Sequence, residues 1–382
     1  MTTLIERMKS EYPSIESSVW DAVQIDPIVM EAGASGQAAP YLQEKGYSRV
    51  IICADEHTYG IVGRELEESV AAAGMQVRVT LIQPDRLGDV IADEASIVQL
   101  LLDIQHLSAE VVVAAGSGTL HDLSRYAAYT AGLPFVSVPT APSVDGFNSK
   151  GAPIIIRGVK QTIAAIGPQA IFADLDILCA APPAMIAAGF GDMLGKYTSL
   201  FDWTYGAQTG GEPFDEAVYE MTWRALQRCV EHVDLIGSGV AKGIRILIES
   251  LIESGIAMLL FGQSHSASGA EHHLSHYWEM EYLRLGKRQL LHGAKVGAAC
   301  AEIAKLYHKQ AELLSEAMQE ELLKVPSEAD IRGLLKRAGG PAAAYELGID
   351  EELLARSLKE AHLVRPNRHT LLRAVNEGAA AQ

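Results

Sequence analysis

Three histidines fall within five residues of one another in segment 268–276, which reads S-G-A-E-H-H-L-S-H. His272 and His276 are four residues apart, so on a helix they would share one face. That spacing is common for two metal ligands, or for one ligand and a proton relay. Histidines on a solvent-exposed face are the alternative interpretation of the same cluster.

Two other segments place glycines beside a residue that could bind a metal. Segment 189–196, G-F-G-D-M-L-G-K, has three glycines around Asp192. It predicts a helix start at which the backbone approaches another group closely. Taken alone, Asp192 would be an ordinary helix cap. His292 opens the segment H-G-A-K-V-G and by itself indicates nothing further.

A glycine turn in segment 111–122, V-V-V-A-A-G-S-G-T-L-H-D, could bind phosphate groups. The pattern predicts a strand, a turn and a helix, which leaves unpaired N–H groups at a positive helix end suited to a pyrophosphate. His121 breaks the G-x-G-x-x-G pattern, and a tight strand-to-helix connection is the alternative. Asp55, which ends an earlier strand, could bind a ribose hydroxyl or cap a helix.

Segment 137–149, S-V-P-T-A-P-S-V-D-G-F-N-S, carries small hydroxyl residues around one carboxylate, Asp145. It leaves the carboxyl end of a predicted strand, which is where open α/β sheets place their ligands. A surface loop without a functional role is the alternative.

The elements that would position these residues differ between the two halves of the chain. We predict strands over residues 49–54, 76–82, 110–115, 134–138 and 170–178, helices over 59–73 and 97–106, and a hairpin over 152–166. Strands that alternate with helices predict a parallel sheet covered on both faces. After residue 182 the pattern is one of consecutive amphipathic helices. The predicted fold is therefore a Rossmann-like α/β domain, residues 1–180, followed by an all-α domain, residues 181–382.

Composition excludes several classes of partner. The 382-residue chain is 48% hydrophobic and 21% charged, which is ordinary for a soluble protein. Its net charge of −17 argues against nucleic acid and anionic membranes as partners. The four cysteines are scattered and predict neither disulfides nor a thiolate metal site. The charged N-terminus is unlike a signal peptide, and the apolar stretch 244–261 contains three charges. We therefore expect a cytoplasmic enzyme.

Taken together, the order of these motifs resembles the glycerol-1-phosphate dehydrogenases. These enzymes belong to the wider group of dehydroquinate synthase-like and iron-containing alcohol dehydrogenases. The resemblance covers residues 49 to 297, and the segments around the three histidines and His292 are its most specific parts. It is closest to the bacterial branch, which is associated with nickel, whereas archaeal relatives are described with zinc.

The resemblance implies a reversible reaction in phospholipid metabolism, in which dihydroxyacetone phosphate and NADH or NADPH give sn-glycerol 1-phosphate. It implies one divalent metal bound by Asp192, His272 and His292, with Asp145, Asp192 and His276 at the substrate. The implied cofactor contacts are Asp55, Thr58, Gly116, Gly118, Thr119, Leu120, His121, Asp122, Thr140, Ala141, Pro142, Ser143 and Ser149. Ser117 departs from the three glycines of many relatives. A homodimer fits the resemblance.

Three other functions stay open at this point. A glycerol dehydrogenase would use the same three ligands on an unphosphorylated polyol, and the sequence identifies no phosphate-binding residues. A dehydroquinate synthase-like lyase would need more Lys and Arg residues around its acidic substrate than the sequence places. A non-catalytic protein that binds metal or nucleotide would not need all three ligands.

Overall fold

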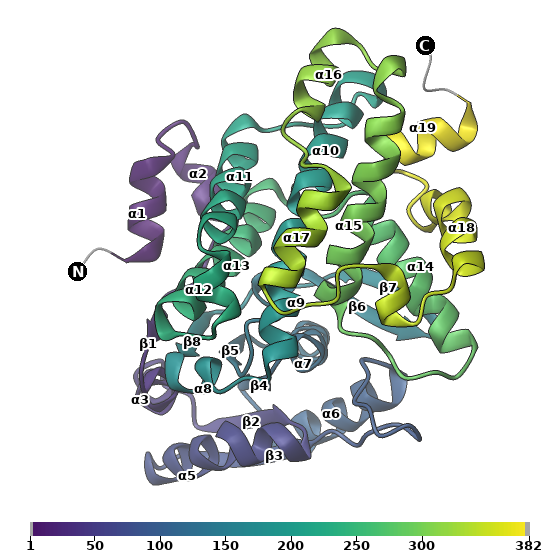
Figure 1. Cartoon of the computed structure of the whole chain (residues 1–382). Helices are drawn as coiled ribbons and strands as arrows, with labels where there is room; N and C mark the ends of the chain where they lie inside the picture. The colour runs from purple at the N-terminus through teal and green to yellow at the C-terminus, as the bar shows by residue number, and fades with distance from the viewer. Residues whose placement is uncertain (1–2, 379–382) are drawn as a thin grey trace. The chain divides into compact units, whose positions relative to one another are not determined.

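The computed structural model describes residues 3–378. The chain forms two compact units, Met1–Pro182 and Pro183–Gln382. The first unit contains all the strands of the described residues, and the second is built from helices (Figure 1). The predicted fold class, a parallel α/β part followed by an all-α part, is confirmed.

The centre of the first unit is a six-stranded sheet of order β1-β8-β5-β4-β2-β3, in which every pair of neighbours is parallel. Its strands are β1 (Ile28–Glu31), β2 (Arg49–Ala54), β3 (Gln76–Leu81), β4 (Val111–Gly116), β5 (Phe135–Pro139) and β8 (Ala170–Asp174). The chain passes from β2 to β3 on one side of β2 and then crosses back to β4 on the other side of β2. The strand order therefore reverses between β2 and β4, which is where sheets of this kind bind ligands.

Alternate side chains of the strands pack on opposite faces of this sheet. Val50 and Ile52 of β2 join one apolar cluster with α3 (Ala38–Glu44) and α5 (Arg64–Ala72). Ile51 and Cys53 of the same strand join a second cluster with α6 (Glu94–Leu107) and α7 (Gly118–Ala131). Because both faces are covered, the central strands β2 and β4 are nearly continuous apolar runs, whereas the edge strand β3 alternates polar and apolar residues.

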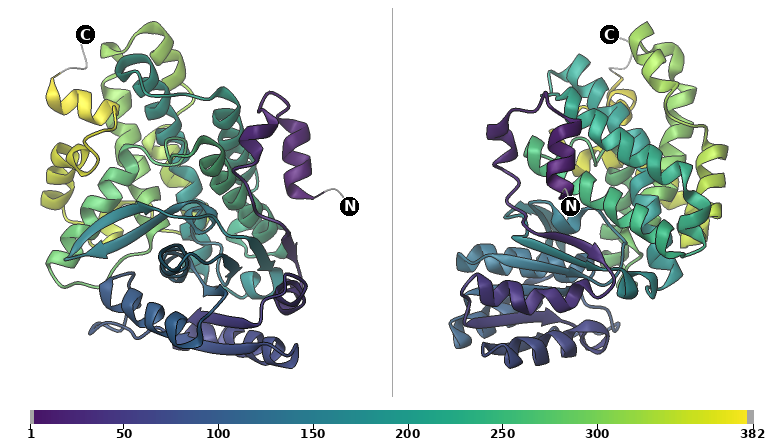
Figure 2. Two further views of the ribbon diagram at one scale, coloured as in Figure 1. Left: turned by 180° about the vertical axis from the view of Figure 1, so that it is seen from behind. Right: turned by 90° about the vertical axis from the view of Figure 1, so that its left-hand side faces the viewer.

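The predicted hairpin is present as β6 (Gly151–Ile156) and β7 (Val159–Ala164), which pair antiparallel along their whole length. It forms a two-stranded ribbon separate from the main sheet, seen from behind in the left view of Figure 2. Gly158, in the connection, has φ of +75°, a conformation that suits glycine.

Some predicted elements need correction. The strand predicted over residues 170–178 is wrong beyond Asp174, whose carboxylate accepts from the Asp176 N–H and starts α8 (Leu175–Cys179). The helix predicted over 59–73 consists of α4 (Glu56–Thr58), a π-helical turn η2 (Tyr59–Gly63) and α5. The short edge strand β1, η1 (Ala34–Gln37) and the helices α1 (Leu4–Glu11) and α2 (Ser17–Trp20) were not predicted.

The second unit consists of consecutive helices, as the amphipathic pattern predicted. Its helices are α9 (Pro183–Leu194), α10 (Lys196–Gly210), α11 (Glu216–Glu231), α12 (Val233–Gly237), α13 (Ala241–Phe261), α14 (Ala270–Arg284), α15 (His292–Lys309), α16 (Glu316–Leu322), α17 (Glu328–Arg337), α18 (Glu351–Glu360) and α19 (Leu371–Glu377), with short turns η4 (Ala311–Leu313), η5 (Ala344–Leu347) and η6 (Ala361–Val364). The apolar stretch 244–261 lies in α13, most of which is buried. Among the described helices, none has the length and apolarity needed to cross a bilayer.

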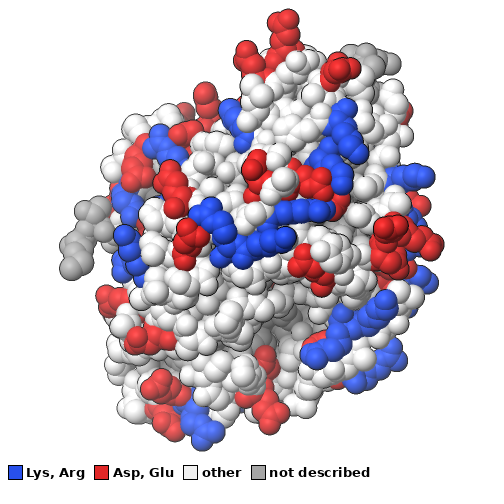
Figure 3. All heavy atoms as spheres, in the orientation of Figure 1, with Lys and Arg blue, Asp and Glu red and all other residues white. Residues whose placement is uncertain are grey.

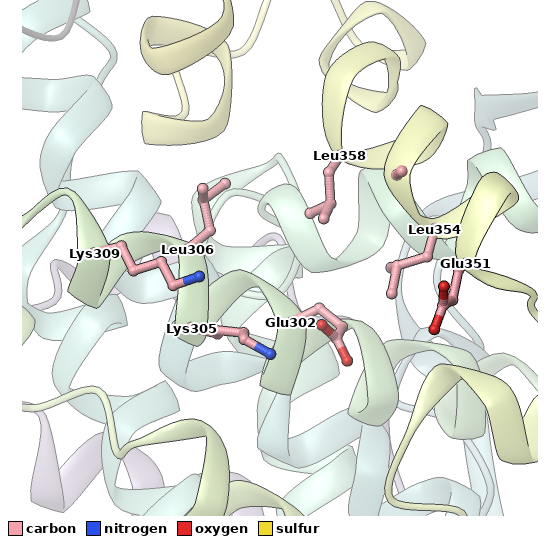
Figure 4. A pocket seen from close by; sticks show the side chains of 8 residues that line it. Glu302, Lys305, Leu306, Lys309, Glu351, Leu354 and Leu358 are labelled. Atoms are coloured by element: carbon pink, nitrogen blue, oxygen red, sulfur yellow. The ribbon is translucent and has the colours of Figure 1, made fainter.

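The surface carries charges of both signs despite the net charge of −17. On the face drawn in Figure 3, Lys and Arg side chains are interspersed with Asp and Glu side chains. A groove of about 270 Å³ lies between α15 and α18 (Figure 4). It is lined by Glu302, Lys305, Leu306, Lys309, Glu351, Leu354, Ala355 and Leu358, none of which is a predicted site residue.

Candidate metal centre and nucleotide edge

Asp192, His272 and His292 converge in the second unit from three different helices, α9, α14 and α15. One potential ligand atom of each lies within 4.8 Å of the other two. The Asp192 Oδ1 atom is 3.6 Å from His272 Nε2 and 3.8 Å from His292 Nε2. Asp192 is fully buried, whereas the His292 side chain is 27% exposed. Two imidazoles and one carboxylate at this spacing fit a divalent cation with positions left open for other ligands.

Glycines explain how Asp192 and His292 come so close. A Cβ on Gly293 would lie 1.8 Å from the Ala188 carbonyl oxygen, and one on Gly191 would lie 2.4 Å from the Gly293 carbonyl oxygen. Helices α9 and α15 therefore touch backbone to backbone beside the two ligands. The close approach predicted from the glycines near Asp192 is to α15. The predicted helix start is wrong, because Asp192 lies in the last turn of α9.

Lys196 is a buried cation next to the Asp192 carboxylate that the sequence did not single out. Its Nζ atom donates to the Asp192 carbonyl oxygen at 3.0 Å and lies 3.9 Å from Asp192 Oδ1. Neither side chain is exposed to solvent. A cation at this distance favours the ionised carboxylate that a metal requires. The signal was in segment 189–196, where Lys196 follows Asp192 by one helical turn.

Glu271 orients the neighbouring ligand His272 and was also missed. Glu271 Oε1 is 2.7 Å from His272 Nδ1 and accepts from the Gly269 N–H, while Glu271 Oε2 accepts from the Thr198 hydroxyl at 2.6 Å. A carboxylate at Nδ1 holds the proton on that nitrogen, so that Nε2 carries the lone pair that a metal ligand needs. Glu271 is fully buried, so water does not compete for these contacts.

His276 lies beside the three candidate ligands, one turn further along α14. Its ring centre is 5.9 Å from that of His292 and 6.2 Å from that of His272. It is not among the residues whose ligand atoms converge. This position is suited to a group that contacts a bound substrate or transfers a proton next to the metal.

The predicted nucleotide residues gather at one edge of the sheet in the first unit. Gly116 pairs with Pro139, and Cys53 pairs with Ala114, so β2, β4 and β5 end side by side. The glycine turn, the loop after β5 and Asp55 all follow these carboxyl ends. The edge is the one at which the strand order reverses, so it has the geometry expected of a nucleotide site.

The turn after β4 is closely packed at both glycines and accommodates serine between them. A Cβ on Gly116 would lie 2.2 Å from Leu120 Cδ1, and one on Gly118 would lie 3.0 Å from Val144. Ser117 has φ of −102° and ψ of −162°, which any residue adopts. The departure from three glycines therefore does not disturb the turn, and α7 still begins at Gly118.

Several residues predicted to contact the cofactor have side chains that form hydrogen bonds within the protein. The ring of His121 is fully buried, with Nε2 2.7 Å from Ser137 Oγ and Nδ1 2.9 Å from the Ser117 carbonyl oxygen. Burial lowers the pKa of His121 to about 3, so the ring is neutral. Asp55 and Thr58 form a reciprocal helix cap, in which Asp55 Oδ1 accepts from the Thr58 N–H at 2.7 Å.

Arg125 fixes the loop after β5 and was not predicted. Its guanidinium donates to the carbonyl oxygens of Gly146, Phe147 and Gly151 and pairs with Asp122 at 2.8 Å. Arg125 is fully buried. The loop also holds the predicted residues Thr140, Ala141, Pro142, Ser143, Asp145 and Ser149, all buried, while Leu120 is buried and Thr119 half-buried in the first turn of α7.

Comparison with known proteins gives, first, a match to a broad family model and to solved structures of the same fold. Residues 29–182 match the family model described as iron-containing alcohol dehydrogenase. Among solved structures, a probable glycerol dehydrogenase from Sinorhizobium meliloti superposes with a TM-score of 0.70 at 19% identity, covering 94% of this chain and 96% of the other. An iron-containing alcohol dehydrogenase from Thermococcus thioreducens gives 0.69 at 16% identity, covering 91% and 93%. At these identities the likeness concerns the fold.

Relatives found by sequence similarity identify the family more narrowly than the solved structures do. Glycerol-1-phosphate dehydrogenase [NAD(P)+] of Geobacillus thermodenitrificans is 47% identical over 377 residues, or 93% of each chain. The proteins of the same name from Bacillus subtilis and Pyrococcus furiosus are 41% and 33% identical, covering 93% and 78% of this chain and 92% and 82% of their own. The chain belongs to the glycerol-1-phosphate dehydrogenase family.

Proposed function

We propose that this protein catalyses the reversible, metal-dependent reduction of dihydroxyacetone phosphate to sn-glycerol 1-phosphate with NADH or NADPH. The observation that carries the proposal is the convergence of Asp192, His272 and His292 on one point. Membership of the glycerol-1-phosphate dehydrogenase family supports the substrate and the cofactor.

When bound, the nicotinamide supplies the hydride and the cation supplies Lewis acidity toward the ketone oxygen, on which negative charge develops. The residues of the chain prepare the site for this chemistry. Asp192 and the Nε2 atoms of His272 and His292 would hold the cation, with Lys196 next to the carboxylate and Glu271 bonded to the other ring nitrogen of His272. We assign His276 to substrate contact or to proton transfer at the reacting oxygen, and Asp145 to the substrate.

We assign nucleotide binding to the carboxyl edge of the sheet. The N–H groups at the start of α7 would bind the pyrophosphate, since this helix begins at Gly118, directly after the strand β4 and its turn. The loop from Thr140 to Ser149, held by Arg125, would line the rest of the site. We assign Asp55 to the ribose, since its hydrogen bond from the Thr58 N–H fixes the position of its carboxylate.

We further propose nickel as the native metal and zinc as the next best, a cytoplasmic location and a homodimer. The donor set suits either metal, because both accept imidazole and carboxylate ligands. Resemblance to the bacterial branch favours nickel. The net charge of −17 supports a small-molecule substrate over nucleic acid or membrane partners.

Metal analysis combined with a substrate panel tests the proposal. We expect the purified protein to contain one divalent metal and to oxidise NADH or NADPH with dihydroxyacetone phosphate, and chelator to abolish the activity. Full activity in metal-free protein would contradict the mechanism. Equal catalytic efficiency with dihydroxyacetone and its phosphate would instead favour a glycerol dehydrogenase.

A further inference from the structure

The C-terminal segment around Arg365 and Arg368 is fastened to the loop that starts the helix of His272. Arg368 donates to the Ser268 carbonyl oxygen at 2.7 Å, and Arg365 donates to the Ser268 hydroxyl at 2.9 Å. Further along, the Leu371 N–H donates to Asp202, which also accepts from the Ala270 N–H at the start of α14. Both arginines are therefore held at the end of α14 that carries the metal ligand.

The two guanidinium groups differ in how their charge is balanced. Arg368 has a carboxylate partner, Glu212, at 3.3 Å. Arg365 donates to the hydroxyls of Ser264, at 3.4 Å, and Ser268, and within residues 3–378 it pairs with no carboxylate. Burial and the charge of Arg368 lower the pKa of Arg365 to about 10, so the group is still a cation at neutral pH. Glu271 attracts this charge from a distance, and among the described residues Arg365 has no carboxylate in direct contact.

Some hydrogen-bond donors around these two arginines also lack an acceptor among the described residues. Arg368 is only 7% exposed, yet its Nη2 atom has no partner among the described residues. His273, which is fully buried and close enough to feel both guanidinium charges, has no partner at either ring nitrogen. Ser264 and Ser268 accept from Arg365, so each can still donate its own proton. Buried donors that lack partners in a folded protein point to a ligand that supplies the acceptors.

We propose that Arg365 and Arg368, together with the hydroxyls of Ser264 and Ser268, bind the phosphate group of the triose substrate. This inference rests on the proposed function and extends it to the part of the substrate that separates it from an unphosphorylated polyol. A phosphate presents several acceptor oxygens and a negative charge, which two forked guanidinium groups and two hydroxyls match. Ser268 lies four residues before His272 and two before α14 begins, so the site adjoins the end of α14 that carries the metal ligand.

Arg365→Gln is the test variant, because glutamine keeps much of the length and loses the charge. We expect kcat/KM for dihydroxyacetone phosphate to fall about 10- to 100-fold through KM, since hydrogen bonds between charged groups are lost. We expect kcat/KM for dihydroxyacetone and the bound metal to be unchanged. Inorganic phosphate should raise the Tm of the metal-loaded wild-type protein and have little effect on that of the variant.

Arg337→Gln is the matched control. Arg337 is an exposed arginine of the same unit that pairs with Asp234 at 2.7 Å, so this variant should keep wild-type KM values. If Arg365→Gln does not fold, Ser268→Ala removes one phosphate donor and should raise KM for the phosphorylated ketone severalfold.

The outcomes separate this inference from the proposed function. A wild-type enzyme that prefers dihydroxyacetone phosphate, with a folded Arg365→Gln that keeps this preference, would overturn the phosphate site alone. Equal losses with both ketones would also overturn it, because the residue would then act on the whole site. A wild-type enzyme without preference for the phosphorylated ketone would contradict the proposed function, and absence of a phosphate effect on its Tm would then overturn the site as well.

Discussion

The metal centre and the nucleotide edge are built in different ways. At the metal centre, side chains from three helices converge, and each of them offers one ligand atom. At the nucleotide edge, the side chains of His121, Asp55 and Arg125 are engaged in bonds within the protein, and the proposed pyrophosphate contacts come from the backbone of the glycine turn. Single side chains should therefore decide metal binding, whereas residues at the edge should act through the shape and stability of the loops.

The substitution His292→Ala tests this difference most directly and has the largest expected effect. Removing one of three ligands should remove the metal and lower kcat by about 10³-fold, because several kcal/mol of transition-state stabilisation are lost. NADH affinity should stay unchanged, since the nucleotide residues belong to the other unit. Metal content by mass spectrometry and NADH binding by fluorescence titration measure the two effects. Parallel loss of NADH binding would show that the two regions are not independent.

The backbone contact that supports the metal centre can be tested with Gly293→Ala. The added Cβ would lie 1.8 Å from the Ala188 carbonyl oxygen, so α9 and α15 must separate. We expect a loss of roughly 1–3 kcal/mol in the free energy of unfolding, and weaker metal binding as Asp192 and His292 move apart.

Gly333→Ala is the matched control for that variant. Gly333 lies inside α17, and no atom outside its own helix is near enough to contact an added Cβ. Alanine should therefore stabilise the helix by about 0.5–1 kcal/mol. Urea unfolding measures both variants, and equal stability of the two would argue against a tight contact between α9 and α15.

An effect confined to acidic pH concerns His121 at the nucleotide edge. Its folded-state pKa, about 3, lies below the ordinary value of 6.5, so between these values the unfolded chain binds a proton that the folded one does not. Stability from the neutral ring is therefore complete above pH 6.5 and falls as the pH drops toward 3. His121→Gln should show a shallower fall in Tm over this range, with both proteins measured in chelator. An identical pH profile would mean that the ring is not buried as described.

The strands and the change to helices could be predicted because they depend on local periodicity. Residues 50–54 form a continuous apolar run after Arg49, and the structure has a strand over Arg49–Ala54. The edge strand β1 escaped prediction because it has four half-buried or exposed residues and depends on pairing with β8. Residues 175–178 are apolar enough for a strand, and the cap by Asp174 makes them helical instead.

The candidate site was open to prediction to the extent that its residues stand in recognisable motifs. The spacing of His272 and His276 indicated a functional role. Lys196 lies in segment 189–196 and Glu271 in segment 268–276, and neither residue type nor spacing marked them as site residues. Arg365 and Arg368 lie outside the segment that carries the resemblance. Only the folded chain brings them to Ser268, about one hundred residues earlier in the sequence.

The sequence by itself determined the fold class, the order of the motifs and the kinds of side chain available for chemistry. These properties follow from periodicity and residue type, which are local. Tertiary structure alone decided that Asp192 lies in the last turn of a helix, that glycines bring α9 and α15 into contact, and that two arginines contact the loop before α14. Such arrangements depend on packing between segments far apart in the chain, and local sequence does not contain that information.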